Sequence, residues 1–511
     1  MRKIKNRIMK LSLGLLPLFL CASLFAGDGF DDASSYLAQR VVEKKLSNGI
    51  TLIMVDTGYS PVLSFVISFK VGSVDESYRT MGAAHLLEHM LFKGTDTIGT
   101  KDFKKEKPIL DKIEALGETL DVLKLRNPSN ELIPAFEKRL SELQKEHSEL
   151  VVSSPYDKLY SEHGGVGFNA STSKDRTAYY ISLPSAELEL WAKTESERLR
   201  NPIMREYYLE RANVLEERLM RYDSVGGGLL FEAFIAQAFA SHPYRHPVIG
   251  WASNIPHLSI KDVREFYYTR YIPSRMTITI VGKQNIDETS LIVEKYFSSI
   301  SRAPEPKDVN VAEEKQLGEK RFEINYEANP EIIIGWHKPT YPSKDDYALD
   351  VLADIITNGM SSKLHKALVI ERKLAHSISA WNGAPGARYN NMFAIFAESA
   401  GGVSLNALEQ AIYEELDKAV SSITDKDIEI VKNQIESNAI LSLSSNSKLA
   451  SVLSYYQTVF GDWRYFTNYH KAVSNITIKD ISEAYKRYCI KENRSVGILN
   501  DTRKGEANER P

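Results

Sequence analysis

The chain has 511 residues, enough for about two to four domains of ordinary size and a large buried core. Its composition is 43% hydrophobic and 26% charged, which excludes a collagen-like, coiled-coil or largely disordered protein. Lysine and arginine number 64 against 67 aspartates and glutamates, so no basic excess exists and nucleic acid is not expected as a partner. The two cysteines, Cys21 and Cys489, allow no disulfide framework.

The first 26 residues have the pattern of a secretory signal peptide. Five lysines and arginines at positions 2–10 precede sixteen uncharged residues, 11–26, and polarity returns at Gly27. The apolar run is shorter than the roughly 20 residues of a membrane span, so we expect cleavage after Ala26. A retained anchor is the alternative, and a lipid-bearing Cys21 is disfavoured by the bulky Leu20. We therefore expect an exported chain, periplasmic or secreted, with no membrane span after cleavage.

An internal repeat predicts two similar halves. Residues 258–267 resemble residues 476–485 at an offset of 218, and both copies begin with a candidate helix cap, Ser259 or Thr477. A weaker match at an offset of 265 pairs residues 61–94 with residues 331–359. We expect α/β halves at 41–300 and 321–501, joined by a polar linker that contains prolines, 301–320.

The two offsets differ by 47 residues, and the extra residues lie at 104–150 of the first half. Apolar residues there recur at spacings of three and four on both sides of a polar breaker, 127–130. This pattern predicts two amphipathic helices in an antiparallel hairpin. We expect the hairpin to pack on its parent domain, and a docking arm for a partner is the alternative.

The strongest chemical signal is the run His85-Leu-Leu-Glu88-His89. Helical residues four apart share a face, so both imidazoles can bind one metal ion. Glu88 would lie beside them, where it can take a proton from a water whose pKa the metal lowers. Two histidines stacked on a surface, without metal, are the alternative.

A catalytic zinc site needs a third protein ligand and one open position. The strongly helical segment 206–221 offers four carboxylates, and spacing alone does not choose among them. They are Glu206, Glu210, Glu216 and Glu217. A solvated acidic helix is the alternative interpretation of this segment.

The histidine motif, followed by Gly94-Thr95, resembles the inverted zinc motif of the M16 (pitrilysin and insulinase) metallopeptidases, in particular their bacterial two-domain members. Residues 164–172, Tyr179-Tyr180 and residues 210–217 extend the resemblance over roughly 41–500. It implies one Zn²⁺ per chain, held by His85, His89 and Glu217. It also implies that Glu88 is the general base and that Glu210 supports catalysis from outside the ligand set.

The resemblance further implies an α+β fold of the LuxS/MPP-like metallohydrolase type. Two homologous α/β sandwich halves, each with one mixed sheet, would close around a chamber. A peptide or unfolded segment would add to an edge strand near residues 169–172, with Asn169 and Ala170 in contact with it. The second half would be inactive, because Asp350, Ala353 and Asp354 stand where the first half has its motif.

Members of the family often carry Arg and Tyr, seven apart, in the second half. Val369 and His376 occupy these places here, and Arg372 is one helical turn out of register. The side of the site that would stabilise the oxyanion is therefore expected to be incomplete. A paralogous M16 subunit that supplies Arg and Tyr is one solution. The alternative is that His376 supplies the contact, in a lone chain or a homodimer.

We therefore expect a zinc-dependent endopeptidase that hydrolyses peptides or unfolded polypeptide segments. The alternative is a non-catalytic scaffold or assembly subunit of the same fold. The complete set of His85, Glu88, His89 and Glu217 favours the enzyme, because a decayed scaffold has no reason to keep all four. Metal storage or sensing would leave Glu88 unexplained.

Overall fold

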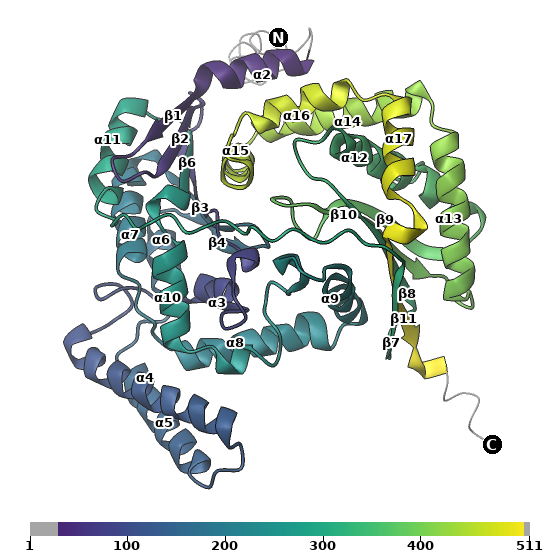
Figure 1. Cartoon of the computed structure of the whole chain (residues 1–511). Helices are drawn as coiled ribbons and strands as arrows, with labels where there is room; N and C mark the ends of the chain where they lie inside the picture. The colour runs from purple at the N-terminus through teal and green to yellow at the C-terminus, as the bar shows by residue number, and fades with distance from the viewer. Residues whose placement is uncertain (1–28, 505–511) are drawn as a thin grey trace, which may run out of the picture.

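The computed structural model describes residues 29–504, which form two halves, each built on a mixed β-sheet with helices (Figure 1). The expected α+β architecture is therefore confirmed. The predicted signal peptide, residues 1–26, and Cys21 lie outside the described residues. Among residues 29–504 no helix is both long and apolar enough to cross a membrane.

The first half contains a six-stranded sheet in the order β1-β2-β6-β3-β5-β4. Its strands are β1 (Val41–Lys45), β2 (Thr51–Asp56), β3 (Val62–Phe69), β4 (Val166–Thr172), β5 (Thr177–Pro184) and β6 (Met276–Gly282). β2 and β6 are parallel, and the other neighbours are antiparallel. β4 is consequently an edge strand with one unpaired side.

The second half repeats this order without a counterpart of β1 among the described residues. Its sheet has the order β7-β11-β8-β10-β9, with β7 and β11 parallel. The strands are β7 (Lys320–Tyr326), β8 (Glu331–Lys338), β9 (Ala375–Ala384), β10 (Asn391–Ser399) and β11 (Arg494–Asp501). The shared topology accounts for the sequence repeat at an offset of 218, since β6 and β11 begin 218 residues apart.

One helix from each half packs on the sheet of the other half. Helix α9 (Gly226–Ala238) packs on β11 and β8, and α15 (Asn446–Phe460) packs on β3 and β6. A hydrogen bond of 2.6 Å between the hydroxyls of Ser68 and Ser454 lies in the second contact. Because α15 covers one face of β3 and the first-half core covers the other, β3 is buried on both faces. A strand of that kind has a continuous apolar sequence rather than an alternating one.

The other helices flank the sheets or connect the strands, except the first, residues 29–40, which precedes β1 and packs against a helix of the second half. In the first half they are α2 (Gly29–Arg40), α3 (Ala83–Met90), α6 (Pro155–Glu162), α7 (Leu188–Arg200), α8 (Tyr207–Arg218), α10 (Ile260–Arg270) and α11 (Ile286–Phe297). In the second half they are α12 (Lys344–Thr357), α13 (Leu405–Ser421), α14 (Asp425–Leu443), α16 (Tyr465–Ser474) and α17 (Ile478–Tyr488). Ser259 and Thr477 cap α10 and α17, as their sequence predicted.

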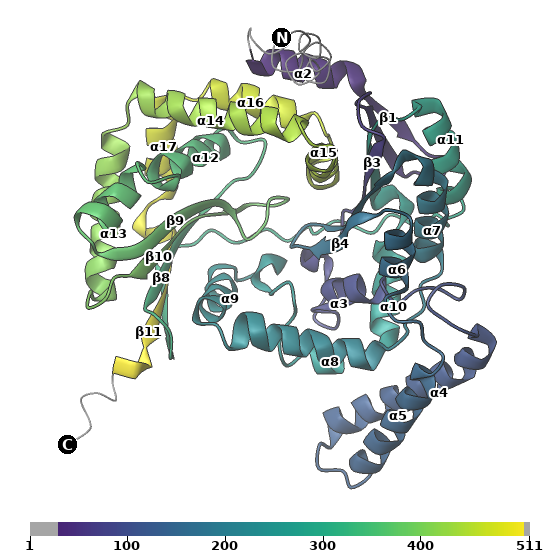
Figure 2. The same ribbon diagram turned by 180° about the vertical axis from the view of Figure 1, so that it is seen from behind.

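The expected helical hairpin consists of α4 (Phe103–Arg126) and α5 (Ile133–Ser148), which project from the first half beside α8 (Figure 2). Its base is fixed by Glu106, a fully buried carboxylate on α4. Glu106 accepts a hydrogen bond from Arg205 at 2.5 Å and lies 2.8 Å from the Nε2 atom of His147 on α5. The hairpin is therefore anchored to the residues that lead into α8.

Two sets of buried polar contacts join the halves beside the exchanged helices. Arg388, from the second half, makes an ion pair of 2.8 Å with the buried Asp75 of the first. The carboxylate of Asp175 accepts hydrogen bonds from the backbone nitrogens of Ala387 and Arg388. Residues 301–319 contain neither helix nor strand, and Arg275 pairs with Glu305 and Asp308 of this segment.

Candidate active site

The start of α3, which carries the histidine motif, is held by a carboxylate and by a close backbone contact. Glu76 accepts hydrogen bonds from the backbone nitrogens of Gly82 at 2.9 Å and Ala84 at 2.8 Å. These nitrogens begin the helix and have no partner within it. Gly82 has φ of 90°, and a Cβ atom there would lie 2.8 Å from the carbonyl oxygen of Ile249. Only glycine fits this turn, so the sequence fixes where α3 begins.

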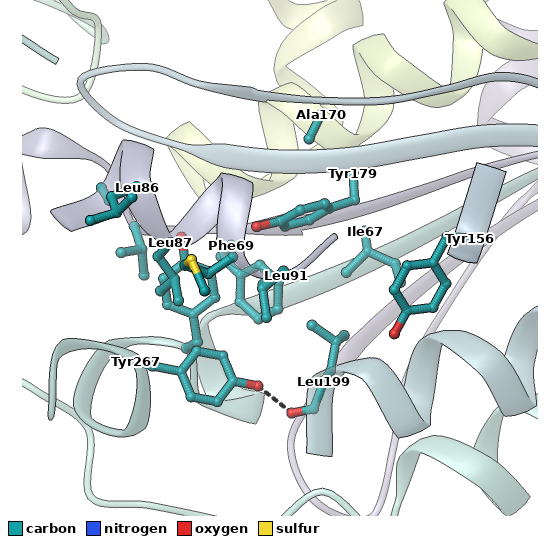
Figure 3. Packing of buried hydrophobic residues seen from close by; sticks show 14 of the residues in the cluster. Ile67, Phe69, Leu86, Leu87, Leu91, Tyr156, Ala170, Tyr179, Leu199 and Tyr267 are labelled. Carbon is teal, nitrogen blue, oxygen red and sulfur yellow. Dashed lines mark hydrogen bonds between the residues drawn. The ribbon is translucent and has the colours of Figure 1, made fainter. Parts of the chain in front are cut away.

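One face of α3 is buried in the first-half core, and the other presents the polar residues of the motif. Leu86, Leu87 and Leu91 pack with Phe69 and Tyr179 (Figure 3). His85, Glu88 and His89 are only partly buried. The 3.6-residue period thus separates a packing face from a chemical face.

Helix α8 packs against α3 and brings a third candidate ligand to the histidines. The Oε2 atom of Glu217 lies 3.7 Å from Nε2 of His85 and 3.5 Å from Nε2 of His89. One ligand atom from each of the three residues lies within 4.8 Å of the others. Metal–ligand bonds of about 2.0–2.1 Å at tetrahedral angles place ligand atoms roughly 3.4 Å apart. The two distances from Glu217 are close to this spacing, so the three side chains could hold a tetrahedral zinc ion with one position left for water or substrate.

A chain of polar contacts orients His89 from behind. Its Nδ1 atom lies 3.4 Å from Oε2 of Glu210. Glu210 in turn pairs with Lys93 at 2.6 Å, and Lys93 pairs with Glu206 at 2.8 Å. A carboxylate on the outer nitrogen of a metal-binding histidine fixes its tautomer and leaves Nε2 for the metal. Glu210 thus lies outside the three-residue cluster, next to one of its members.

The charges around the two histidines move their pKa values in opposite directions. Burial, with the positive charges of His89 and Arg221, lowers the pKa of His85 to about 3. Burial also acts to lower the pKa of His89, but Glu210, Glu217 and Glu88 outweigh it and raise that pKa. Burial alone would raise the pKa of Glu210, yet its contacts with His89 and Lys93 lower it to about 2. Glu210 is therefore ionised at neutral pH.

Glu88 stands next to the cluster and is held by the edge strand. The hydroxyl of Thr172, the last residue of β4, donates a hydrogen bond to Oε2 of Glu88. Burial raises the pKa of Glu88, and the bond from Thr172 opposes that rise. A carboxylate with a raised pKa is a better proton acceptor than an ordinary one.

The two residues expected to touch substrate lie on β4 and face different ways. Asn169 is exposed, and its side-chain oxygen accepts a hydrogen bond of 2.8 Å from the backbone nitrogen of Ala170. The methyl group of Ala170 is buried in the first-half core (Figure 3). A contact between Ala170 and a peptide would therefore have to be made by its main chain.

The second half contains no copy of the cluster among its described residues. Asp350 accepts a hydrogen bond of 2.8 Å from the side-chain nitrogen of Asn382 and one of 3.2 Å from the hydroxyl of Tyr469, within a buried polar network. Asp354 accepts a bond from Asn358. Both carboxylates are therefore engaged in hydrogen bonds within the second half.

Val369 and His376, which stand where the family often has Arg and Tyr, lie in different elements of the second half. The π-helical segment η7 (His365–Glu371) ends before Arg372, Lys373 has φ of 51°, and β9 begins at Ala375. A left-handed residue ends a helix, so Val369 and His376 belong to different elements. Arg372 pairs with Glu414 and Glu415 on α13. His376 is exposed at the start of the edge strand β9.

Four residues around the motif were missed by sequence reasoning: Glu76, Lys93, Thr172 and Arg221. Two of them had a usable signal, since Lys93 follows His89 by four residues and Arg221 follows Glu217 by four. Arg221 lies 2.9 Å from Oε1 of Glu217. Thr172 and Glu76 come from other elements, so no spacing along the chain could have connected them to the motif.

Two family models match the chain: one spans the clustered residues and Glu88, and the other begins after them. The model described as "Insulinase (Peptidase family M16)" matches residues 52–122 and 148–251, and the model described as "Peptidase M16 inactive domain" matches residues 257–435. Together they cover more than half of the sequence. The chain belongs to peptidase family M16. The first M16 model leaves out residues 123–147, which fall within the α4–α5 hairpin.

Several M16 relatives span most of the chain. The zinc protease PqqE of Helicobacter pylori is 25% identical over 464 residues, 89% of this chain and 91% of its own. A protein of Mycobacterium leprae, named an uncharacterized zinc protease, is 26% identical over 432 residues, 81% of each chain. The crystal structure of a protease from Helicobacter pylori matches with a TM-score of 0.74 at 24% identity, over 90% of this chain and 99% of that one. The M16 fold of two halves is therefore shared along nearly the whole length.

Proposed function

We propose that this M16 protein is a zinc-dependent endopeptidase, with His85, His89 and Glu217 as the metal ligands. The observation that carries the proposal is the convergence of three ligand atoms within 4.8 Å, next to Glu88. Zinc, when bound, supplies a Lewis acid that lowers the pKa of a water molecule and polarises a carbonyl group. The names of the relatives, zinc proteases, support the same metal.

In this proposal Glu88 is the general base and Thr172 holds it in place. Glu88 accepts the proton of the attacking water and later gives it to the nitrogen of the leaving amine. Glu210 keeps the Nδ1 atom of His89 hydrogen-bonded, so that Nε2 is available to the metal. Each of these roles belongs to a side chain whose position is set by α3, α8 or β4.

We propose extended peptides or unfolded segments as substrates, bound along the free side of β4. The strand pairs with β5 on one side only, and Thr172 at its end touches Glu88. Main-chain hydrogen bonds to a strand edge select an extended backbone rather than a sequence. Asn169 and the main chain of Ala170 would contact such a peptide. After export, the protein would act in the periplasm or outside the cell. His376, at the edge of β9, is the second-half candidate for contact with it.

The M16 family model of the second half carries the word inactive in its description, and the non-catalytic scaffold is the competing function. Cleavage of unfolded peptides by the purified chain, with and without zinc, separates the two. A paralogous M16 subunit or a second copy of this chain remains a proposed partner. Activity of the chain measured alone, as monomer or homodimer, against activity with such a partner tests that part.

A further inference from the structure

The segment that follows α8 places a positive charge next to the proposed metal ligands. Arg221 lies in a π-helical turn, η3 (Leu219–Asp223), directly after Glu217 and Arg218. Its Nη1 atom is 2.9 Å from Oε1 of Glu217, whereas Oε2 of the same carboxylate faces the two histidines. The carboxylate of Glu217 therefore bridges the guanidinium of Arg221 and the two histidines.

The side chain of Arg221 is more exposed than those of Lys93 and Arg218, the other cations near α3 and the end of α8. Its side chain is 70% exposed, and the water around the guanidinium weakens its ion pair with Glu217. Lys93 is fixed between Glu206 and Glu210 behind His89. Arg218 is fixed by two bonds to Glu232, at 2.6 and 2.8 Å, and by a bond to the carbonyl of Gly250. Arg221 can thus turn toward a bound peptide at little cost.

We propose that Arg221 is a catalytic residue that donates a hydrogen bond to the carbonyl oxygen of the scissile peptide bond. This inference rests on the proposed peptidase function. When the water oxygen bonds to the carbonyl carbon, the π electrons of the carbonyl move to its oxygen and the water proton passes to Glu88. The guanidinium stabilises the negative charge on that oxygen. The C–N bond then breaks, the carbonyl re-forms, and the amine nitrogen takes the proton from Glu88.

At the second-half places where the family often carries Arg and Tyr, this chain has Val369 and an exposed His376. Arg372 is paired with Glu414 and Glu415 on α13, and Val369 is apolar. A preorganised donor at an oxyanion contributes about 100- to 1000-fold in kcat. Since Arg221 is exposed and paired with Glu217 rather than preorganised for the oxyanion, we expect a smaller contribution, at least tenfold.

The experiment compares Arg221→Ala, Arg221→Lys and the wild-type chain, each loaded with zinc, on an unfolded peptide. We expect Arg221→Ala to lower kcat at least tenfold, with KM and zinc content unchanged, and Arg221→Lys to recover part of the loss. Affinity for a phosphinic peptide, an anionic tetrahedral analogue of the transition state, should fall by the same factor as kcat/KM. Arg139→Ala, which removes another exposed helical ion pair, is the matched control and should change nothing.

Three results would overturn the inference. Loss of zinc from Arg221→Ala, with activity restored by added zinc, would make Arg221 a positioning residue for Glu217. Unchanged kcat and unchanged affinity for the phosphinic peptide would leave Arg221 without a role, while zinc-dependent cleavage by the wild type would still support the proposed function. A wild-type chain that holds zinc but cleaves no peptide would overturn both the proposed function and this inference.

Discussion

The Nδ1 atom of His89 lies 3.4 Å from Glu210, on the side of the ring that points away from Glu217. The two glutamates are two turns apart on α8, yet they meet opposite nitrogens of one imidazole. This arrangement gives the two carboxylates different roles. Glu217 belongs to the cluster of three candidate ligands, and we propose that Glu210 orients His89 while Lys93 balances the charge of Glu210.

The first prediction separates these two glutamates. Glu217→Gln should lose bound zinc together with activity, because it removes a charged ligand. Glu210→Gln should bind zinc about 10- to 100-fold more weakly, as for loss of an outer hydrogen bond, and should still fill the site at saturating zinc. Metal analysis after dialysis against buffered zinc measures both. The exposed Glu216→Gln is the control, and an empty site in Glu210→Gln at saturating zinc would reverse the assignment.

The second prediction concerns the turn that starts α3. Gly82→Ala forces a Cβ atom to within 2.8 Å of the carbonyl oxygen of Ile249, in a conformation that alanine rarely adopts. We expect a fall in the free energy of unfolding of at least about 2 kcal/mol and weaker zinc binding. Gly58→Ala is the control, because Gly58 has φ of 76° with open space around its Cβ position. Equal effects of the two substitutions in urea unfolding would show that the contact with Ile249 is unimportant.

The third prediction concerns acid stability at the base of the hairpin. Burial alone would raise the pKa of Glu106, but its bonds with His147 and Arg205 outweigh burial and lower it to about 2. A carboxyl with a lowered folded pKa stabilises the fold above its unfolded value, 4.5, and this stability is lost as pH falls toward 2. Glu106→Gln should therefore lose about 3–5 kcal/mol at neutral pH, since it leaves Arg205 buried with its ionic partner removed.

Unfolding measured between pH 2 and pH 7 tests this third prediction. The difference in unfolding free energy between wild type and Glu106→Gln should shrink as the pH falls below 4.5. Glu142→Gln, which removes an exposed pair with Arg139, should leave both stability and its pH dependence nearly unchanged. A difference that stays constant down to pH 2 would contradict the ionised state of Glu106.

Sequence periodicity and repeats predicted much of this fold because they report local structure. The helix of His85 and His89, the hairpin of residues 104–150 and the two similar halves are all visible in spacing alone. The packing of α9 and α15 on the sheet of the opposite half was not predicted, because the apolar pattern of a helix does not identify the sheet on which it packs. The separation of Val369 and His376 into different elements was not predicted either, because it depends on one residue with positive φ, Lys373.

In the candidate site, too, local spacing grouped some residues, whereas the others come together only through tertiary packing. Residues at helical spacing, His85, Glu88 and His89, could be grouped from the sequence. Glu217 was chosen among four carboxylates only through a family resemblance, and the cluster in the structure contains the same residue. Thr172 comes from a strand 84 residues away from Glu88, so only folding reveals that it touches the proposed base.

The central claim is that Glu88 is the general base of a zinc peptidase, and Glu88→Gln tests it most directly. Glutamine keeps the size of the side chain and can still accept the hydrogen bond from Thr172, but it cannot take a proton. We predict zinc content equal to that of the wild type, with kcat on an unfolded peptide lowered at least about 100-fold. A variant that keeps its zinc and more than about a tenth of the wild-type kcat would contradict the account.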